Sequence, residues 1–153
     1  MKPVTVHVAV PNGREQVYRH LDVLANHEAF TDHMLVDWQC SGPRSGVGAR
    51  ARMRLKKPGR PDWMDLEVTA AEPPLATVEE TVGAGGRRHT RGTYRLQEVP
   101  GGGTKISFEI AWLRVPPAER LAAPLTRAVM RRGNRRSLQR LAAALDPTHK
   151  ENR

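Results

Sequence analysis

The sequence predicts an α+β fold in which a curved antiparallel sheet of about seven strands wraps around one long C-terminal helix, with two short helices after the first strand. Stretches of alternating apolar and polar residues recur along the chain with the period of two that half-buried strands show. Tight turns rich in glycine and proline separate the later stretches, so consecutive strands are expected to pair as an antiparallel meander. Each strand then has one apolar face, and the only element long enough to cover such a sheet is the C-terminal helix.

The first part of the chain is expected to form one strand and two short helices. Residues 4–10 alternate valine with less apolar residues, and a Pro-Asn-Gly turn ends this strand. Residues 14–21 place Val17 and Leu21 four positions apart on one helical face. A second short helix is expected over residues 24–30.

Six strands and a long helix are expected in the remainder of the chain. The strands are predicted over residues 34–40, 49–56, 64–70, 75–82, 88–99 and 104–113. Pro116 and Pro117 mark the beginning of the helix, which is expected to reach about Leu145 before Asp146 and Pro147 end it.

Length and composition indicate one globular domain. The chain has 153 residues, of which 39% are hydrophobic, enough to form a real core. We expect a single domain over residues 1–147 and a short polar tail over 148–153. No apolar run approaches the roughly 20 residues that span a bilayer, the N-terminus lacks a secretory pattern, and the lone Cys40 fits a reducing compartment. The sequence therefore predicts a cytoplasmic protein.

Basic residues form a stripe with a period of two on one predicted strand. The net charge is +9, and Arg50, Arg52, Arg54 and Lys56 lie on the polar face of this strand. A surface for an anionic ligand or nucleic acid is one interpretation. We favour a cross-strand ladder, because Asp65 and Glu67 of the next strand offer partners on the same face.

The C-terminal helix is also strongly basic. A nucleic-acid or membrane-surface helix is one interpretation; we favour a solvated outer face, because no aromatic residue in the helix offers a base-stacking surface. The apolar positions expected to face the sheet are Leu121, Leu125, Ala128, Leu138, Ala142 and Leu145. At 100° per residue Arg131 and Arg135 lie near this stripe, where one of them could pair with a ligand carboxylate or phenolate, and Gly133-Asn134 is a point where the helix could bend.

Metal, cofactor and nucleophile signatures are weak. His20, His27 and His33 lack the spacing of a metal site, so a structural or surface role is expected. No Gly-x-Ser-x-Gly motif supports a serine nucleophile, and Cys40 is expected to be a small core residue. We expect neither a metal nor a cofactor.

Two adjacent carboxylates lie in the strand predicted over residues 75–82. Alternation with Val78 and Val82 points Glu80 inward, where a carboxylate of raised pKa is a candidate general base. Pairing of Glu80 with an inward arginine is an alternative. A register shifted by one residue would instead place Glu79 inside.

Several short segments, in their order along the chain, resemble one known family. They are Val10-Pro11, the stretch 24–30, Gly46-Val47-Gly48, Gly92-Thr93-Tyr94, Gly102-Gly103-Thr104 and Gly133-Asn134-Arg135-Arg136. Together they resemble the START-like or SRPBCC superfamily, the polyketide cyclase/dehydrase family with its helix-grip (Bet v 1-like) fold. The resemblance implies a cavity between the sheet and the last helix. It implies no universal catalytic motif, so no catalytic residue is carried over.

The leading functional hypothesis is binding of a hydrophobic or aromatic molecule, such as a lipid, polyketide or quinone, in this cavity. The residues expected to line it are Trp38, Met53, Leu66, Val68, Val78, Tyr94, Phe108, Ile110, Leu121 and Leu125. A polyketide aromatase/cyclase is the alternative, with Glu80, Tyr94 and Arg131 as candidate catalytic residues. A nucleic-acid- or ribosome-associated module is a further alternative that we expect to be wrong. The sequence leaves monomer and homodimer open.

Overall fold

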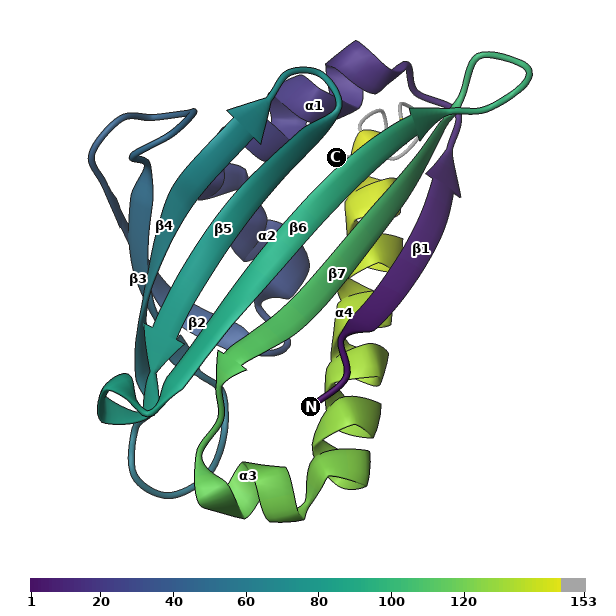
Figure 1. Ribbon diagram of the computed structural model, residues 1–153. Coiled ribbons are helices and arrows are strands. Elements are labelled where there is room, and N and C mark those ends of the chain that lie inside the picture. The colour runs from purple at the N-terminus through teal and green to yellow at the C-terminus, as the bar shows by residue number, and fades with distance from the viewer. Residues whose placement is uncertain (147–153) are drawn as a thin grey trace.

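A computed structural model describes residues 1–146, so the predicted tail over 148–153 lies outside the described residues. Seven strands form one antiparallel sheet in the order β1-β7-β6-β5-β4-β3-β2 (Figure 1). Their bounds are Val4–Val10 (β1), Leu35–Ser41 (β2), Arg50–Leu55 (β3), Trp63–Glu72 (β4), Ala76–Gly83 (β5), Arg88–Glu98 (β6) and Thr104–Arg114 (β7). The predicted meander of β2 to β7 is confirmed, and β1 closes the sheet beside β7.

The helices also follow the predicted order. Their bounds are Arg14–Asp22 (α1), Leu24–Asn26 (η1), His27–Thr31 (α2), Ala84–Gly86 (η2), Pro117–Leu121 (α3) and Ala123–Leu145 (α4). The predicted single C-terminal helix is thus interrupted at Ala122, two residues before Pro124, which lacks the N–H that a helix interior uses. Beyond that break α4 is continuous through Gly133 and Asn134, where the sequence allowed a bend.

Three helices share the cover of the sheet, rather than α4 alone. In Figure 1, α1, α2 and α4 all lie behind the sheet. α4 packs against β1 and α2, whereas α1 packs against β6 and α2 against β2. The core-facing stripe of α4 comprises Asn134, Leu138, Leu141 and Leu145, three or four positions apart.

The N-terminal half of the C-terminal helical segment does not face the sheet. Leu121 is 88% exposed and Leu125 is 66% exposed, so the expectation that they line an internal cavity is wrong. The physical reason is that the core-facing stripe of α4 lies on the other side of the helix. Leu125 lies nine residues before Asn134, which at 100° per residue places it on the opposite side of the helix.

The hydrophobic core is divided into two clusters. One joins β1, β6 and β7 to α1, α2 and α4; it includes Val17, Phe30, Ile106 and Leu138. The other joins β3 and β4 to the start of η1, and its buried residues are Leu24, Ala49, Ala51, Met53, Met64, Leu66 and Val68. β5 lies between β4 and β6 and contributes to neither cluster.

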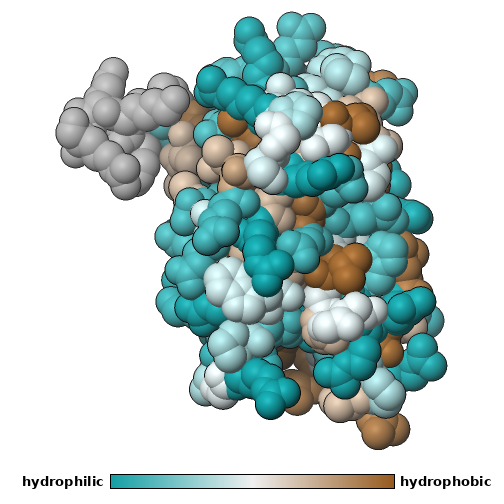
Figure 2. All heavy atoms as spheres, turned by 90° about the vertical axis from the view of Figure 1, so that its left-hand side faces the viewer, coloured by the Kyte–Doolittle hydropathy of each residue, from teal (hydrophilic) through white to brown (hydrophobic). Residues whose placement is uncertain are grey.

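The outer face of the sheet carries the charge ladder that the sequence predicts. Arg50 pairs with Glu67 at 3.4 Å and Arg52 with Asp65 at 3.3 Å. Such exposed pairs each contribute about 0.2–1 kcal/mol. The side of the molecule next to β3 and β4 is accordingly mostly hydrophilic, with scattered hydrophobic patches (Figure 2).

Two details differ from the predicted strands and helices. Asp37 has a φ of 58° inside an irregularity of β2, and this bulge ends the predicted alternation from Met34 to Cys40. Cys40 is therefore exposed and does not belong to the core. Among the described helices, none is long and apolar enough to cross a membrane.

Candidate functional site

β5 turns Thr77, Glu79 and Thr81 toward the helices. Glu79 lies across from Gly92 of β6 and Val68 of β4, both of which are buried. A Cβ atom on Gly92 would lie 3.2 Å from Cγ of Glu79 and 2.8 Å from the ring of Phe108. Glu79 therefore shares the inner face with Phe108, and Gly92 leaves the space that both side chains use.

The expectation that Glu80 points inward is wrong. Its carboxylate pairs with Arg91 at 3.1 Å and lies 3.6 Å from Nε2 of His89, on the outer face. Val78 lies on the same outer face, two positions away, and so does not line an interior cavity. The two valines of β5 suggested the opposite register because apolar residues usually face the core, but Val82 is 39% exposed.

Glu79 faces a buried histidine from α2. Oε2 of Glu79 lies 3.9 Å from Nδ1 of His27. Burial raises the pKa of Glu79 to about 8 and lowers the pKa of His27 to about 4. Their contact is therefore not an ion pair at neutral pH, because both groups are uncharged between those two values.

The tautomer of His27 follows from its second contact. Nε2 lies 2.7 Å from the carbonyl oxygen of Leu21, which can only accept a hydrogen bond. Nε2 therefore carries the proton, and Nδ1 presents a lone pair toward Glu79. A carboxylic acid that donates and an imidazole nitrogen that accepts thus lie side by side in the interior.

Aromatic side chains surround this pair. The ring of His27 lies 5.1 Å from Phe30, 5.7 Å from Tyr94 and 6.4 Å from Trp38, measured between centroids. Tyr94 and Phe108 lie 4.4 Å apart. Burial, and the nearby carboxyl of Glu79, raise the pKa of Tyr94 well above its usual value, so its hydroxyl stays protonated. Four aromatic residues from α2, β2, β6 and β7 therefore enclose one polar pair.

Two uncharged polar side chains on the helices that cover the sheet also have a buried atom without a partner among the described residues. Oη of Tyr18 and Nδ2 of Asn134 make no hydrogen bond among the described residues. Asn134 belongs to the core-facing stripe of α4 and Tyr18 to the buried face of α1. Buried polar atoms without partners are rare in folded proteins.

Most of the predicted lining residues do lie on the inner face of the sheet. They are Trp38, Met53, Leu66, Val68, Tyr94, Phe108 and Ile110. Trp38 is only partly buried, whereas the others are buried. That they contact a ligand stays a prediction. Arg131, the remaining catalytic candidate, is half-buried on α4.

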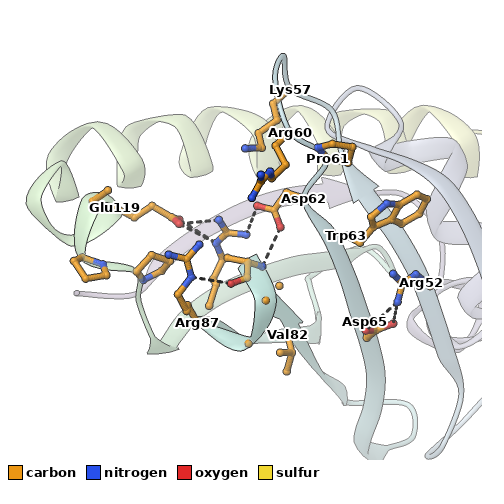
Figure 3. Close-up of a pocket in the computed structure, with 18 residues that line it drawn as sticks. Arg52, Lys57, Arg60, Pro61, Asp62, Trp63, Asp65, Val82, Arg87 and Glu119 are labelled. Atoms are coloured by element: carbon orange, nitrogen blue, oxygen red, sulfur yellow. Dashed lines mark hydrogen bonds and ion pairs between the residues drawn. The ribbon is translucent and has the colours of Figure 1, made fainter.

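Two surface pockets lie away from this cluster. The larger, of about 790 Å³, lies at the end of the sheet between η2, α3 and the loop before β4 (Figure 3). At its base Arg88 bonds Asp62 at 2.8 Å and Glu119 at 2.7 Å. The second, of about 440 Å³, lies on the outer face between β3, β4 and β5. Neither adjoins α4, so the predicted internal cavity stays a prediction.

Comparison with known proteins identifies the family. A family described as polyketide cyclase / dehydrase and lipid transport matches residues 1–146. The chain belongs to this family. The START-like resemblance and the helix-grip fold class are thereby confirmed.

Solved structures show the same fold at low sequence identity. Protein TTHA0849 from Thermus thermophilus has a TM-score of 0.72 and 18% identity over 95% of this chain and 100% of its own. Protein CV1439 from Chromobacterium violaceum has a TM-score of 0.71 and 17% identity over 96% and 99%. DynU16, from the dynemicin biosynthetic locus, has a TM-score of 0.67 and 20% identity, covering 97% of this chain and 48% of its own. No curated protein matches the chain.

Sequence reasoning missed the pair that the fold brings together. His27 was assigned a structural or surface role, and Glu79 appeared only as the alternative to Glu80. One signal was present: Thr77, Glu79 and Thr81 form a polar alternation of their own, opposite the valines of the same strand. Nothing in the sequence indicated that His27 would lie across from it.

Proposed function

We propose that this chain binds a hydrophobic or aromatic small molecule in the interior between the sheet and its helices, with Glu79 and His27 as the polar contacts. The observation that carries the proposal is an uncharged donor and acceptor, 3.9 Å apart, among four aromatic side chains. Binding sites for small molecules combine such apolar walls with a few converging polar groups.

The separation of the pair suggests what the ligand carries. At 3.9 Å the two groups are too far apart for a direct hydrogen bond, whereas an oxygen atom placed beside the pair can lie at hydrogen-bond distance from both. The Glu79 hydroxyl donates to that oxygen, and a ligand hydroxyl donates in turn to Nδ1 of His27. The preferred ligand is thus a planar apolar molecule with a neutral phenolic or enolic hydroxyl.

The energetics support a role in binding. Burying a carboxyl group that lacks a hydrogen-bond partner costs about 1–3 kcal/mol. An aliphatic residue would avoid this cost and would join the two core clusters that flank β5. The family description, which covers both polyketide enzymes and lipid transport, also fits an apolar ligand.

A polyketide aromatase/cyclase is the second candidate function, with Glu79 in the role expected for Glu80. In keto–enol tautomerisation, Glu79 gives its proton to the carbonyl oxygen while Nδ1 of His27 takes a proton from the adjacent carbon. The pair is then carboxylate and imidazolium, and proton transfer from His27 to Glu79 restores the neutral pair. Such paired transfer contributes typically 10²–10⁴-fold in rate.

Binding is tested with 2-naphthol and naphthalene as probes. We expect the native protein to bind 2-naphthol about 5–100-fold more tightly than naphthalene, since each of the two hydrogen bonds contributes about 0.5–1.5 kcal/mol. Glu79→Leu should reduce this preference by about 3–10-fold, because only the bond to His27 remains, while Glu80→Leu, on the outer face, should keep the native preference. Isothermal titration calorimetry gives both affinities.

The same proposal predicts a passenger in the protein purified from its own host. Native mass spectrometry with organic extraction should reveal a stoichiometric apolar or aromatic compound. An empty protein that also binds neither probe would overturn the binding proposal.

Tautomerisation is tested with 2-tetralone in D₂O, by following deuterium uptake at its activated carbon by NMR. We expect the native protein to accelerate exchange, and Glu79→Gln to reduce that acceleration by at least about 100-fold, because an amide cannot transfer the proton. Glu80→Gln is the matched control and should exchange at the native rate. Equal exchange in native protein and Glu79→Gln would exclude the enzymatic alternative and leave the binding proposal standing.

A further inference from the structure

Large aliphatic side chains form an exposed row on the outer side of α3 and α4. Leu121 is 88% exposed, Leu125 is 66% exposed and Val129 is 63% exposed. They are spaced four residues apart, and backbone hydrogen bonds from Ala122 to Ala118 and from Thr126 to Ala122 continue across the break between the helices. At 100° per residue Leu125 and Val129 lie roughly 180° and 220° around α4 from Asn134. No packing within the described chain explains the row.

Arginines continue this row toward the C-terminal end of α4. Arg132 and Arg136 are exposed and lie three and seven residues beyond Val129, on the same side of the helix. α4 contains six arginines and no acidic residue. Arg127 bonds the carbonyls of Lys2 and Pro3, and Arg140 pairs with Asp32. The other four, Arg131, Arg132, Arg135 and Arg136, have no ion pair or hydrogen bond with any described residue.

The one acidic residue of α3 and α4 does not neutralise this surface. Glu119 of α3 is held by Arg88 through bonds of 2.7 Å and 3.0 Å. The surface therefore combines exposed aliphatic groups with uncompensated positive charge. We name it the α3–α4 surface, defined by Leu121, Leu125, Val129, Arg132 and Arg136.

We propose that the α3–α4 surface docks on anionic lipid bilayers, with the aliphatic row in the interfacial region and the arginines on lipid phosphates. A helix with exposed leucines and valines and a basic remainder has the composition of an interfacial helix. Arginine also forms the bidentate contacts that phosphate groups favour. The inference is independent of the ligand proposed above, because it uses none of the residues of the Glu79–His27 pair.

Other occupants fit this surface less well. Two copies of the chain packed through the row would leave the arginines without acidic partners, because Glu119 is the one acidic residue of α3 and α4 and Arg88 holds it. Nucleic acid would satisfy the arginines but leave the aliphatic row exposed, and α3 and α4 contain no aromatic side chain to stack on a base.

The test is co-sedimentation with vesicles of two compositions: pure phosphatidylcholine, and equal amounts of phosphatidylcholine and phosphatidylglycerol. We expect the native protein to bind the anionic vesicles at least about tenfold more tightly, with an affinity that falls as salt is added. The variant Leu121→Ser/Leu125→Ser/Val129→Ser should lose about tenfold on anionic vesicles, as should Arg132→Gln/Arg136→Gln. These positions are exposed, so the fold should persist, which circular dichroism checks.

A matched control separates docking from net charge. Arg52→Gln/Arg54→Gln removes the same charge from the outer face of the sheet and should bind vesicles as the native protein does. Equal loss in this control would overturn the proposal, since the charge of the whole protein would then suffice. Failure to bind anionic vesicles would also overturn it, as would a dimer in light scattering that only the serine variant abolishes.

Discussion

Replacing Glu79 by glutamine should make the protein progressively more stable than the native chain as the pH rises from 4.5 to about 8. The native carboxyl keeps its proton in the folded state up to about pH 8, whereas the same group ionises near pH 4.5 when unfolded. Between these values the folded state binds more protons than the unfolded state, so raising the pH destabilises it by about 1.4 kcal/mol per pH unit. The accumulated difference is on the order of 5 kcal/mol, and urea unfolding at a series of pH values measures it.

His27 contributes a pH dependence of the opposite sign. Its pKa is about 4 in the folded protein against 6.5 for the free side chain, so the stability it contributes is present above pH 6.5 and is lost as the pH falls toward 4. Between pH 4.5 and 6.5 the two slopes oppose each other in the native chain. Above pH 6.5 only the loss from Glu79 remains, so native stability should decline there.

The control for this experiment is Glu80→Gln. Glu80 is paired with Arg91 on the outer face, and its side chain is 26% exposed against 14% for Glu79, so its substitution should not reproduce the growing stabilisation expected of Glu79→Gln. A constant difference between native protein and Glu79→Gln from pH 5 to 8 would mean that Glu79 ionises in the folded state as freely as in the unfolded one. The neutral pair on which the proposed function rests would then not exist.

The order of elements could be predicted from the sequence because local signals determine it. Period-two alternation and tight turns mark the strands, and these signals lie within each segment. The charge ladder from Arg50 to Glu67 was predictable for the same reason, since adjacent strands joined by a turn place their polar faces together. The packing of the helices could not be predicted in this way, because α4 packs against β1, which comes from the other end of the chain. This packing leaves Leu121 and Leu125 exposed.

The error in predicting which face of β5 is buried has a physical meaning. A strand with valines on one face and threonine and glutamate on the other should bury the valines, yet this fold buries Glu79. Natural proteins break local patterning mainly at functional or strained sites. The position at which the predicted register was wrong is therefore also the strongest structural argument that the interior around Glu79 and His27 has a role beyond stability.

Removing the guanidinium of Arg88 should strongly destabilise the protein. Arg88→Met leaves two carboxylates without their partner, and the side chain of Asp62 is only 6% exposed. Breaking one member of a buried ion pair typically costs about 3–5 kcal/mol. The expected loss is near the lower end, because Glu119 is 29% exposed and can turn toward water. Urea unfolding at neutral pH provides the measurement.

The pH dependence of Arg88→Met distinguishes loss of the ion pair from loss of packing. Burial alone would raise the pKa of Asp62, but the Arg88 guanidinium and the N–H of Ala84 hold that pKa below its usual value. Asp62 therefore contributes stability at neutral pH that is lost as the pH falls through its folded pKa. Without Arg88 the carboxyl can be protonated at higher pH, so the deficit of the variant should shrink toward acid pH. Arg87→Met should change stability by less than about 0.5 kcal/mol, because this exposed side chain bonds no described residue besides the carbonyl of Ala84. A deficit that is the same at pH 4 and pH 8 would assign the effect to packing, and Arg88 would then tether α3 to the sheet by contact rather than by charge.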